Sequence, residues 1–160
     1  MPLSKSQRPE VSRQQLIEAL NEDLSREYQA VIAYVVYSQV LKGAEYMNIA
    51  AELVTHASEE LQHALTIAKQ VDYLGGMPAV NAKSVKTSKS AKAMLGFDLE
   101  NERVTIANYR ERVKQCEALG EYAMAEEIRQ ILVQEQEHLI DLATALGVEI
   151  PKITKEPLGR

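Results

Sequence analysis

The sequence predicts an all-α protein that folds as one four-helix bundle, and three observations predict this fold class. Apolar residues recur at steps of three and four through four long segments, the spacing of one face of an α-helix. The 160 residues include 7 glycines, 5 prolines, one phenylalanine and no tryptophan, which favours helices over a sheet. The second half of the chain also repeats the pattern of the first half.

The first helix is expected to begin at residue 12, because residues 12–15 (Ser-Arg-Gln-Gln) have the form of a capping box. Residues 1–11 are polar, contain two prolines and show no period, so they are expected to form a flexible arm. The helix should end before Gly43, since glycine commonly follows the last helical turn. Its predicted inward stripe is Leu16, Leu20, Leu24, Glu27, Val31, Tyr34, Ser38 and Leu41.

A second helix is expected from about Ala44 to Leu74, where residues 75–78 (Gly-Gly-Met-Pro) stop it. Residues 75–90 form the only long irregular segment between helices. A helix of ~30 residues is ~45 Å long, so a crossover to a third, parallel helix must run back along the bundle. The predicted inward apolar residues of the second helix are Leu53, Ala57, Ala64, Ile67 and Val71.

The third helix is expected to be capped by Ser88 or Ser90 and to end before a tight turn at Gly120. Apolar residues keep a regular heptad spacing along it, which predicts one continuous inward stripe. Its predicted inward positions are Leu95, Leu99, Glu102, Ile106, Tyr109, Val113 and Cys116.

The fourth helix is expected from about Glu121 to Leu146 and should close at Gly147. Two prolines in the last thirteen residues leave no room for a fifth helix, so residues 148–160 are expected to form an irregular tail. The bundle is therefore predicted to span residues 12–147. The predicted inward positions of the fourth helix are Ile128, Ile131, Glu135, His138, Leu142 and Ala145.

Two Glu-x-x-His motifs, Glu60 to His63 and Glu135 to His138, use two of the three histidines in the chain. On an α-helix this spacing places a carboxylate and an imidazole on one face, about one turn apart. Each motif has a glutamate at the same distance upstream. The six candidate metal ligands are Glu27, Glu60, His63, Glu102, Glu135 and His138.

The repeat brings these six residues into matched positions. Aligning the two halves without a gap predicts two similar helical hairpins around a pseudo-twofold axis, with the six residues converging on its midpoint. The identical aligned pairs include Leu20 and Leu95, Asp23 and Asp98, Leu24 and Leu99, Glu27 and Glu102, Tyr34 and Tyr109, Ala50 and Ala125, Glu52 and Glu127, Glu60 and Glu135, His63 and His138, and Ala68 and Ala143.

Four carboxylates within apolar stripes that contain no lysine or arginine require a cation, because an unpaired buried carboxylate costs on the order of several kcal/mol. For any one of them, a solvated position at the edge of the stripe is the better explanation. For six residues at matched positions it is not. Oxygen and nitrogen donors without thiolates suit two divalent ions of the iron or manganese kind, with zinc as a further substitute.

Several other residues are candidates for supporting roles. Tyr34 and Tyr109 lie two turns after the upstream glutamates, where a phenol could bond a ligand carboxylate or supply an electron. His56 lies two turns before the ligand histidine of its helix and is more consistent with a core or supporting histidine than with a ligand. The candidates to orient the ligand imidazoles are Asp23, Asp98, Glu59 and Gln134.

The six-residue pattern resembles the dimetal site of the ferritin-like superfamily, and that of bacterioferritin in particular, over residues 12–147. The resemblance implies an antiparallel ferritin-like bundle with a long crossover between its second and third helices. It also implies that Glu60 and Glu135 bridge two irons per subunit. One further glutamate and one histidine would complete the coordination of each iron. The implied function is ferroxidase activity with O2 or H2O2, for iron storage or detoxification in a protein shell.

Departures from the family's pattern leave alternatives open. Leu61 occupies the position of the haem-binding methionine of bacterioferritins, so haem is not expected. Thr105 replaces a glutamate that rubrerythrins carry, yet a di-iron or di-manganese peroxidase or oxidase that stores nothing, rubrerythrin-like or catalase-like, remains the first alternative. Cys116 lacks the second cysteine of archaeal Dps-like proteins and is most simply a core residue.

The expected assembly is a homo-oligomer, between a dimer and a shell of about 12 or 24 subunits. A Dps-like shell that protects DNA through the lysines of the crossover (Lys83, Lys86 and Lys89) is a less favoured alternative, because the net charge is −5. The last alternative is a purely structural bundle with a relic site that binds no metal. No leader or apolar run long enough for a membrane is evident, and a single cysteine excludes an internal disulfide, so a cytoplasmic protein is expected.

Overall fold

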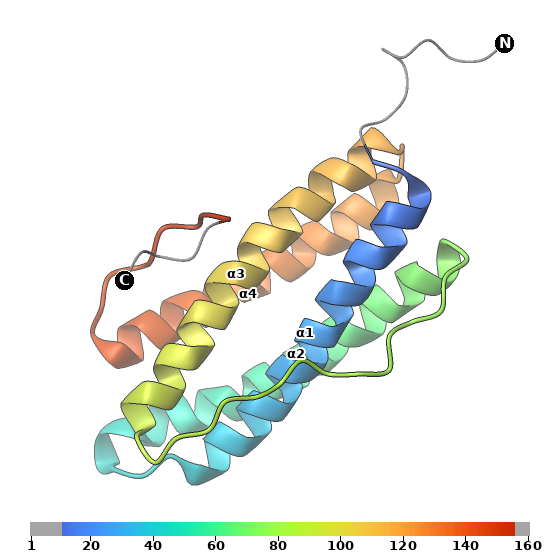
Figure 1. The fold of residues 1–160 in the computed structure, drawn as a ribbon. Helices are drawn as coiled ribbons and strands as arrows, with labels where there is room; N and C mark the ends of the chain where they lie inside the picture. Colours follow the sequence, from blue (N-terminus) through green and yellow to red (C-terminus); the bar gives the residue numbers. More distant parts are fainter. Residues whose placement is uncertain (1–10, 156–160) are drawn as a thin grey trace, which may run out of the picture.

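The computed structural model describes residues 11–155, and these form a bundle of four long α-helices (Figure 1). No strand occurs within this part of the chain, so the all-α prediction is confirmed. Residues 1–10 of the expected arm and residues 156–160 of the expected tail lie outside the described residues. The helices are α1 (Arg13–Val40), η2, a short 3-10 helix (Ala44–Tyr46), α2 (Met47–Tyr73), α3 (Ala91–Ala118) and α4 (Tyr122–Leu146).

The start of α1 has the predicted capping box. The Ser12 hydroxyl accepts a hydrogen bond from the Gln15 backbone N–H at 3.1 Å, and the Gln15 side chain accepts one from the Ser12 N–H at 2.8 Å. Two N–H groups that would otherwise lack partners in the first turn are thereby bonded. At the start of α3, Ser90 and not Ser88 is the capping residue, and its hydroxyl accepts from the Ala93 N–H.

The start of α2 differs from the expectation of a regular helix from Ala44. Residues 44–46 form a 3-10 turn, and the α-helix begins at Met47. Gly43 reverses the chain with φ of 120°, a conformation open to glycine, and has no side chain to cap the turn. The Tyr46 N–H therefore bonds the Gly43 carbonyl at 3.1 Å, which closes the tighter turn.

The crossover of residues 75–90 runs back along α1, as predicted, so that α3 starts at the same end of the bundle as α2 (Figure 1). Hydrogen bonds attach the crossover to successive turns of α1, which explains how a segment without secondary structure is held in place. The bonded pairs, in order along both segments, are Asn21 with Ala79, Ser25 with Lys83, Gln29 with Ser84, and Tyr37 with Lys86.

The buried interior has an apolar cluster toward each end of the bundle and a polar layer between them. One cluster includes Leu16 and Leu24 of α1, and the other includes Tyr37 and Leu41 of the same chain segment. Glu27 lies between these two parts of α1 and is buried. The helices thus exclude water from the middle of the bundle while placing charged groups there, which makes that layer the candidate site.

Residues 148–155, the part of the chain after α4 that the structure describes, have no regular secondary structure. Gly147, at φ of 66°, ends the helix, and the tail then returns along α3. The buried Arg103 guanidinium donates to the Thr154 carbonyl at 2.8 Å, and Lys155 pairs with Glu111 at 3.1 Å. Among residues 11–155, no helix is long and apolar enough to cross a membrane.

Candidate metal centre

All six predicted ligands meet in the polar layer, and each is no more than 3% exposed. One glutamate comes from α1 and one from α3, while α2 and α4 each supply a glutamate and a histidine one turn apart. The matched positions in the two hairpins are therefore brought together around one point. The residues are Glu27, Glu60, His63, Glu102, Glu135 and His138.

The six side chains form two overlapping groups of four, each with its donor atoms within 4.8 Å of one another. Glu60 and Glu135 belong to both groups. Glu27 and His63 complete one group, and the remaining two residues complete the other. This arrangement has the form of two neighbouring metal positions with two shared carboxylates.

The contacts of the two imidazoles repeat across the pseudo-twofold axis. The Nδ1 atom of His63 lies 3.1 Å from Glu60 Oε2 and 3.2 Å from Glu135 Oε1. The Nδ1 atom of His138 lies 2.9 Å from the other oxygen of Glu60 and 3.3 Å from the other oxygen of Glu135. Each of the two carboxylates therefore offers one oxygen to each half of the centre.

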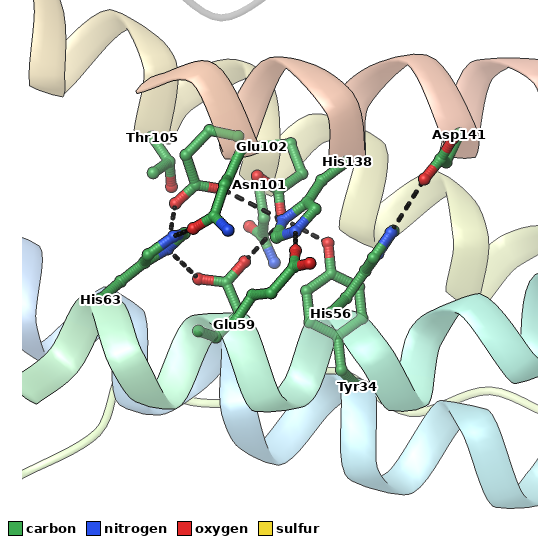
Figure 2. A network of polar contacts seen from close by, with 12 residues as sticks. Tyr34, His56, Glu59, His63, Asn101, Glu102, Thr105, His138 and Asp141 are labelled. Atoms are coloured by element: carbon green, nitrogen blue, oxygen red, sulfur yellow. Dashed lines mark hydrogen bonds and ion pairs between the residues drawn. The ribbon is translucent and has the colours of Figure 1, made fainter. Parts of the chain in front are cut away.

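The second nitrogen of each imidazole is held by the residue that precedes the glutamate of the opposite motif. His63 Nε2 lies 2.6 Å from the Gln134 side-chain oxygen. His138 Nε2 lies 2.6 Å from Glu59 Oε2 (Figure 2). With Nε2 donating, both rings present Nδ1 to the centre. The two halves differ here, because one imidazole faces a neutral amide and the other a carboxylate.

Asp23 and Asp98, the other two candidates, hydrogen-bond neither imidazole. Asp23 accepts a bond from Arg112 at 2.7 Å, and burial raises its pKa to about 7 although Arg112 acts in the opposite direction. Asp98 Oδ2 accepts no hydrogen bond from any described residue, and burial together with Glu102 raises the pKa of Asp98 well above its usual range.

The two tyrosines bond the carboxylates of the opposite hairpin. Tyr34 of α1 donates to Glu102 of α3 (Figure 2), and Tyr109 of α3 donates to Glu27 of α1. The sequence suggested a bond to a ligand carboxylate without indicating which one. Each phenol thereby fixes one carboxylate oxygen and leaves the second oxygen for another partner.

Several buried carboxylate oxygens accept no hydrogen bond from any residue between 11 and 155. They are Oε2 of Glu27, Oε2 of Glu102 and both oxygens of Glu135. Buried oxygens without donors are rare and costly in proteins, and cations are their natural partners. The set combines carboxylates with imidazoles and includes no thiolate, so it fits first-row divalent ions such as Fe(II) or Mn(II).

Protons balance part of the negative charge in the metal-free centre. Burial, with Glu102 and Glu27 adding to it, raises the pKa of Glu135 to about 8, and burial with the neighbouring carboxylates raises that of Glu60 as well. Burial acts in the same direction on Glu102, but its neighbours Glu135 and His138 outweigh burial and lower the pKa of Glu102 to about 2. The pKa of Glu27 is lowered in the same way.

Both ligand imidazoles are held protonated. Burial disfavours the charged form of His63 and His138, but the surrounding carboxylates outweigh it and raise both pKa values well above the usual range. A metal ion needs the Nδ1 lone pair, so it must displace these protons. An ion bound through Nδ1 at this centre would therefore release protons.

His56 lies beside the centre, buried as expected for a core histidine. Its ring stacks on that of His138 with centroids 4.0 Å apart, and its Nε2 atom lies 3.0 Å from Asp141 Oδ2 (Figure 2). Sequence reasoning missed Asp141, which comes from another helix. It also missed Glu52, although its position one turn before His56 on α2 was a readable signal.

Comparisons with known proteins agree with this geometry. The Ferritin family model, described as a ferritin-like domain, matches residues 17–149. The bacterioferritin of Brucella melitensis is 28% identical over 146 residues, which are 91% of this chain and 90% of that protein.

Two solved structures have the same fold. A ferritin-like, diiron-carboxylate protein from Bacillus anthracis superposes with a TM-score of 0.80 at 29% identity, covering 84% of this chain and 96% of that one. The dodecameric thioferritin of Bacteroides fragilis, a bacterioferritin-related protein, superposes with a TM-score of 0.79 at 28% identity, covering 86% and 87%.

The resemblance read from the six-residue pattern is thus confirmed by relatives of matching length, and the predicted ferritin-like bundle with a long crossover is the observed one. The matched region includes α2, α3, α4 and all of α1 except its first four residues. The chain belongs to the Ferritin family of ferritin-like domains.

Proposed function

We propose that this protein is a ferroxidase that binds two Fe(II) ions per subunit and passes one electron from each to O2 or H2O2, for iron storage or detoxification. The observation that carries the proposal is the pair of four-residue groups that share Glu60 and Glu135. Shared carboxylates hold two ions next to each other, which suits an oxidant that takes two electrons. The diiron-carboxylate nature of the Bacillus anthracis protein supports this function.

In this proposal each residue has a defined task. Glu60 and Glu135 bridge the ions, and each ion is completed by one glutamate and one histidine. Tyr34 and Tyr109 orient the non-bridging carboxylates by donating to one oxygen of each. The terminal ligand pairs are Glu27 with His63 and Glu102 with His138. Leu61 has no atom that could bind a haem iron, so haem has no part in the proposal.

The difference between Glu59 and Gln134 predicts that the two positions bind metal unequally. A carboxylate behind a ligand imidazole makes it a better donor, so the His138 position should bind first. Glu59→Gln is expected to weaken that position by about 10- to 100-fold and to make the two affinities similar. Gln134→Glu should strengthen the other position. Calorimetric titration of the metal-free protein with Co(II) measures both; unchanged affinities in both variants would contradict the prediction.

Storage is tested by particle size and iron capacity together. We expect light scattering after size-exclusion chromatography to show a shell, and aerobic Fe(II) addition to load far more than two irons per subunit. The dodecameric Bacteroides fragilis protein supports a shell. A dimer that retains only two metals per subunit would instead favour a non-storing oxidase or peroxidase. Counting manganese and zinc in the purified protein tests whether iron is the preferred metal.

A DNA-protecting shell receives less support from the crossover. Lys83 pairs with Glu22 at 2.6 Å, and the Lys86 ammonium lies 5.5 Å from the centre of the Phe97 ring. These contacts give two of the three candidate lysines a role in attaching the crossover to the bundle. Salt-dependent retention of DNA that disappears when the lysines are neutralised would reverse this preference.

A further inference from the structure

A second cluster of metal-ligating side chains lies outside the six-residue centre. Glu52 and His56 are one turn apart on α2, and Asp141 reaches them from α4. One donor atom from each of the three lies within 4.8 Å of the other two. The closest pair is His56 Nε2 and Asp141 Oδ2, at 3.0 Å (Figure 2).

Packing alone does not explain the histidine in this cluster. His56 is only 2% exposed, and its Nδ1 atom has no hydrogen-bond partner among the described residues. A buried ring with one unpaired nitrogen costs free energy that an apolar side chain of similar size would avoid. The position therefore requires a reason for keeping an imidazole.

A hollow open to solvent lies over the cluster. Its volume is about 360 Å³, and three carboxylates line it. These belong to Glu45, Glu52 and Asp141. A concave surface lined by one sign of charge concentrates ions of the opposite sign. Cations thus have access to Glu52 and Asp141 from solvent, while His56 is buried against the centre.

The internal repeat supplies a comparison within the same molecule. The other hairpin has a hollow of ≈ 340 Å³ that includes the positions equivalent to the cluster and extends from them to His63 and Gln134. At these positions the second hollow keeps the glutamate but has isoleucine and threonine where the cluster has His56 and Asp141, and its one imidazole is His63 of the six-residue centre. The fold alone therefore does not produce the donor set. The equivalents of Glu52, His56 and Asp141 are Glu127, Ile131 and Thr66, and all three line the second hollow.

We propose that Glu52, His56 and Asp141 bind a divalent first-row metal ion as a third metal site. Two carboxylates and one imidazole suit Fe(II), Mn(II), Co(II) or Zn(II), and three protein donors leave positions for water. Because the His56 ring stacks on His138, an ion held here lies between the acidic hollow and the dinuclear centre. The site receives ions from the α2 and α4 face and keeps them next to the centre.

The test exchanges the cluster for the residues that the other hairpin carries. His56→Ile with Asp141→Thr uses side chains already accommodated at the equivalent positions, so the bundle should still fold. Equilibrium dialysis of the full-length protein against saturating Co(II), followed by metal analysis, is expected to give one fewer ion per chain than the wild type. Glu127→Gln, the matched control in the second hollow, should leave the number unchanged.

Crystals soaked in Co(II) locate the ion directly. Anomalous difference density is expected between Glu52, His56 and Asp141 in the wild type and is expected to be absent in the double variant. If the double variant does not fold, Asp141→Asn serves in its place, with weaker Co(II) binding expected. Equal Co(II) numbers in wild type and variant, or no density between the three residues at full occupancy of the centre, would overturn the proposal.

This proposal does not depend on ferroxidase activity. If the six-residue centre bound no metal, the wild type would still hold one more ion per chain than the double variant. If the centre binds two ions and the third site binds none, the two proteins would hold equal numbers. The two failures are therefore distinguishable.

Discussion

Glu60→Gln is expected to lower the rate of Fe(II) oxidation by more than about 100-fold, because loss of a residue that merely supports a ligand already costs 10- to 100-fold. The Glu60 oxygens lie 3.1 Å from His63 Nδ1 and 2.9 Å from His138 Nδ1, so this residue serves both metal positions. Glutamine keeps the shape of the side chain but removes the negative charge and one oxygen donor. The initial rate of Fe(III) formation after aerobic Fe(II) addition measures the loss.

The same substitution should not destabilise the metal-free protein. Burial and three neighbouring carboxylates raise the pKa of Glu60, so an uncharged glutamine is at least as well accommodated. Thermal unfolding in the presence of a chelator should give a melting temperature equal to or above that of the wild type. Glu127→Gln, an exposed change on α4, is the matched control for the rate. Full activity in Glu60→Gln would rule out its bridging role.

Metal loading is expected to have the largest effect on stability. At a free metal concentration 100 times the dissociation constant, each bound ion stabilises the fold by about 2.7 kcal/mol, so two ions contribute about 5 kcal/mol. For a chain of this length that corresponds to a rise of roughly 10–20 °C in melting temperature. Scanning calorimetry before and after Co(II) addition, with a chelator to reverse the change, measures it.

The size of this effect should increase as the pH rises from about 5 to 8. His63 and His138 have folded pKa values above the unfolded value of 6.5, so their stabilisation is complete below that pH and is lost above it. Glu135, with a pKa raised from 4.5 to about 8, destabilises the fold progressively across the same interval. The metal-free protein therefore loses stability as the pH rises through this interval, because its unfolded chain binds fewer protons than the folded one.

Metal binding has the opposite pH dependence, because the ions compete with those protons. The difference in melting temperature between loaded and metal-free protein should thus widen toward pH 8. Glu60→Gln, which cannot hold both ions in the same way, should show a smaller widening. A difference that is constant with pH would mean that the centre does not release protons on binding.

The sequence was sufficient for the helices and for the convergence of the six residues, because both follow from periodicities along the chain. The spacing of Glu60 and His63 places them on one face of a helix, and the repeat places the same pair in the other hairpin. Local signals also located the capping box at Ser12 and the end of α4 at Gly147. These features depend on residues a few positions apart.

The contacts between hairpins could not be read in the same way. Tyr34 bonds Glu102 and not its near neighbour Glu27, because the choice depends on how far α1 is shifted along α3. The pairing of His56 with Asp141 depends similarly on the packing of α2 against α4. Such shifts are set by side-chain packing over the whole interface, and no short sequence pattern encodes them.

The exchange of tyrosines between hairpins has a consequence for how such a chain can arise. Each hairpin holds the phenol that orients the other's carboxylate, so one hairpin alone could make these contacts only with a second copy of itself. A bundle made of two identical hairpins would have the same residues in both halves of its centre. Joining them in one chain allows the halves to diverge. Glu59 opposite Gln134 and His56 opposite Ile131 are differences that a pair of identical hairpins could not carry.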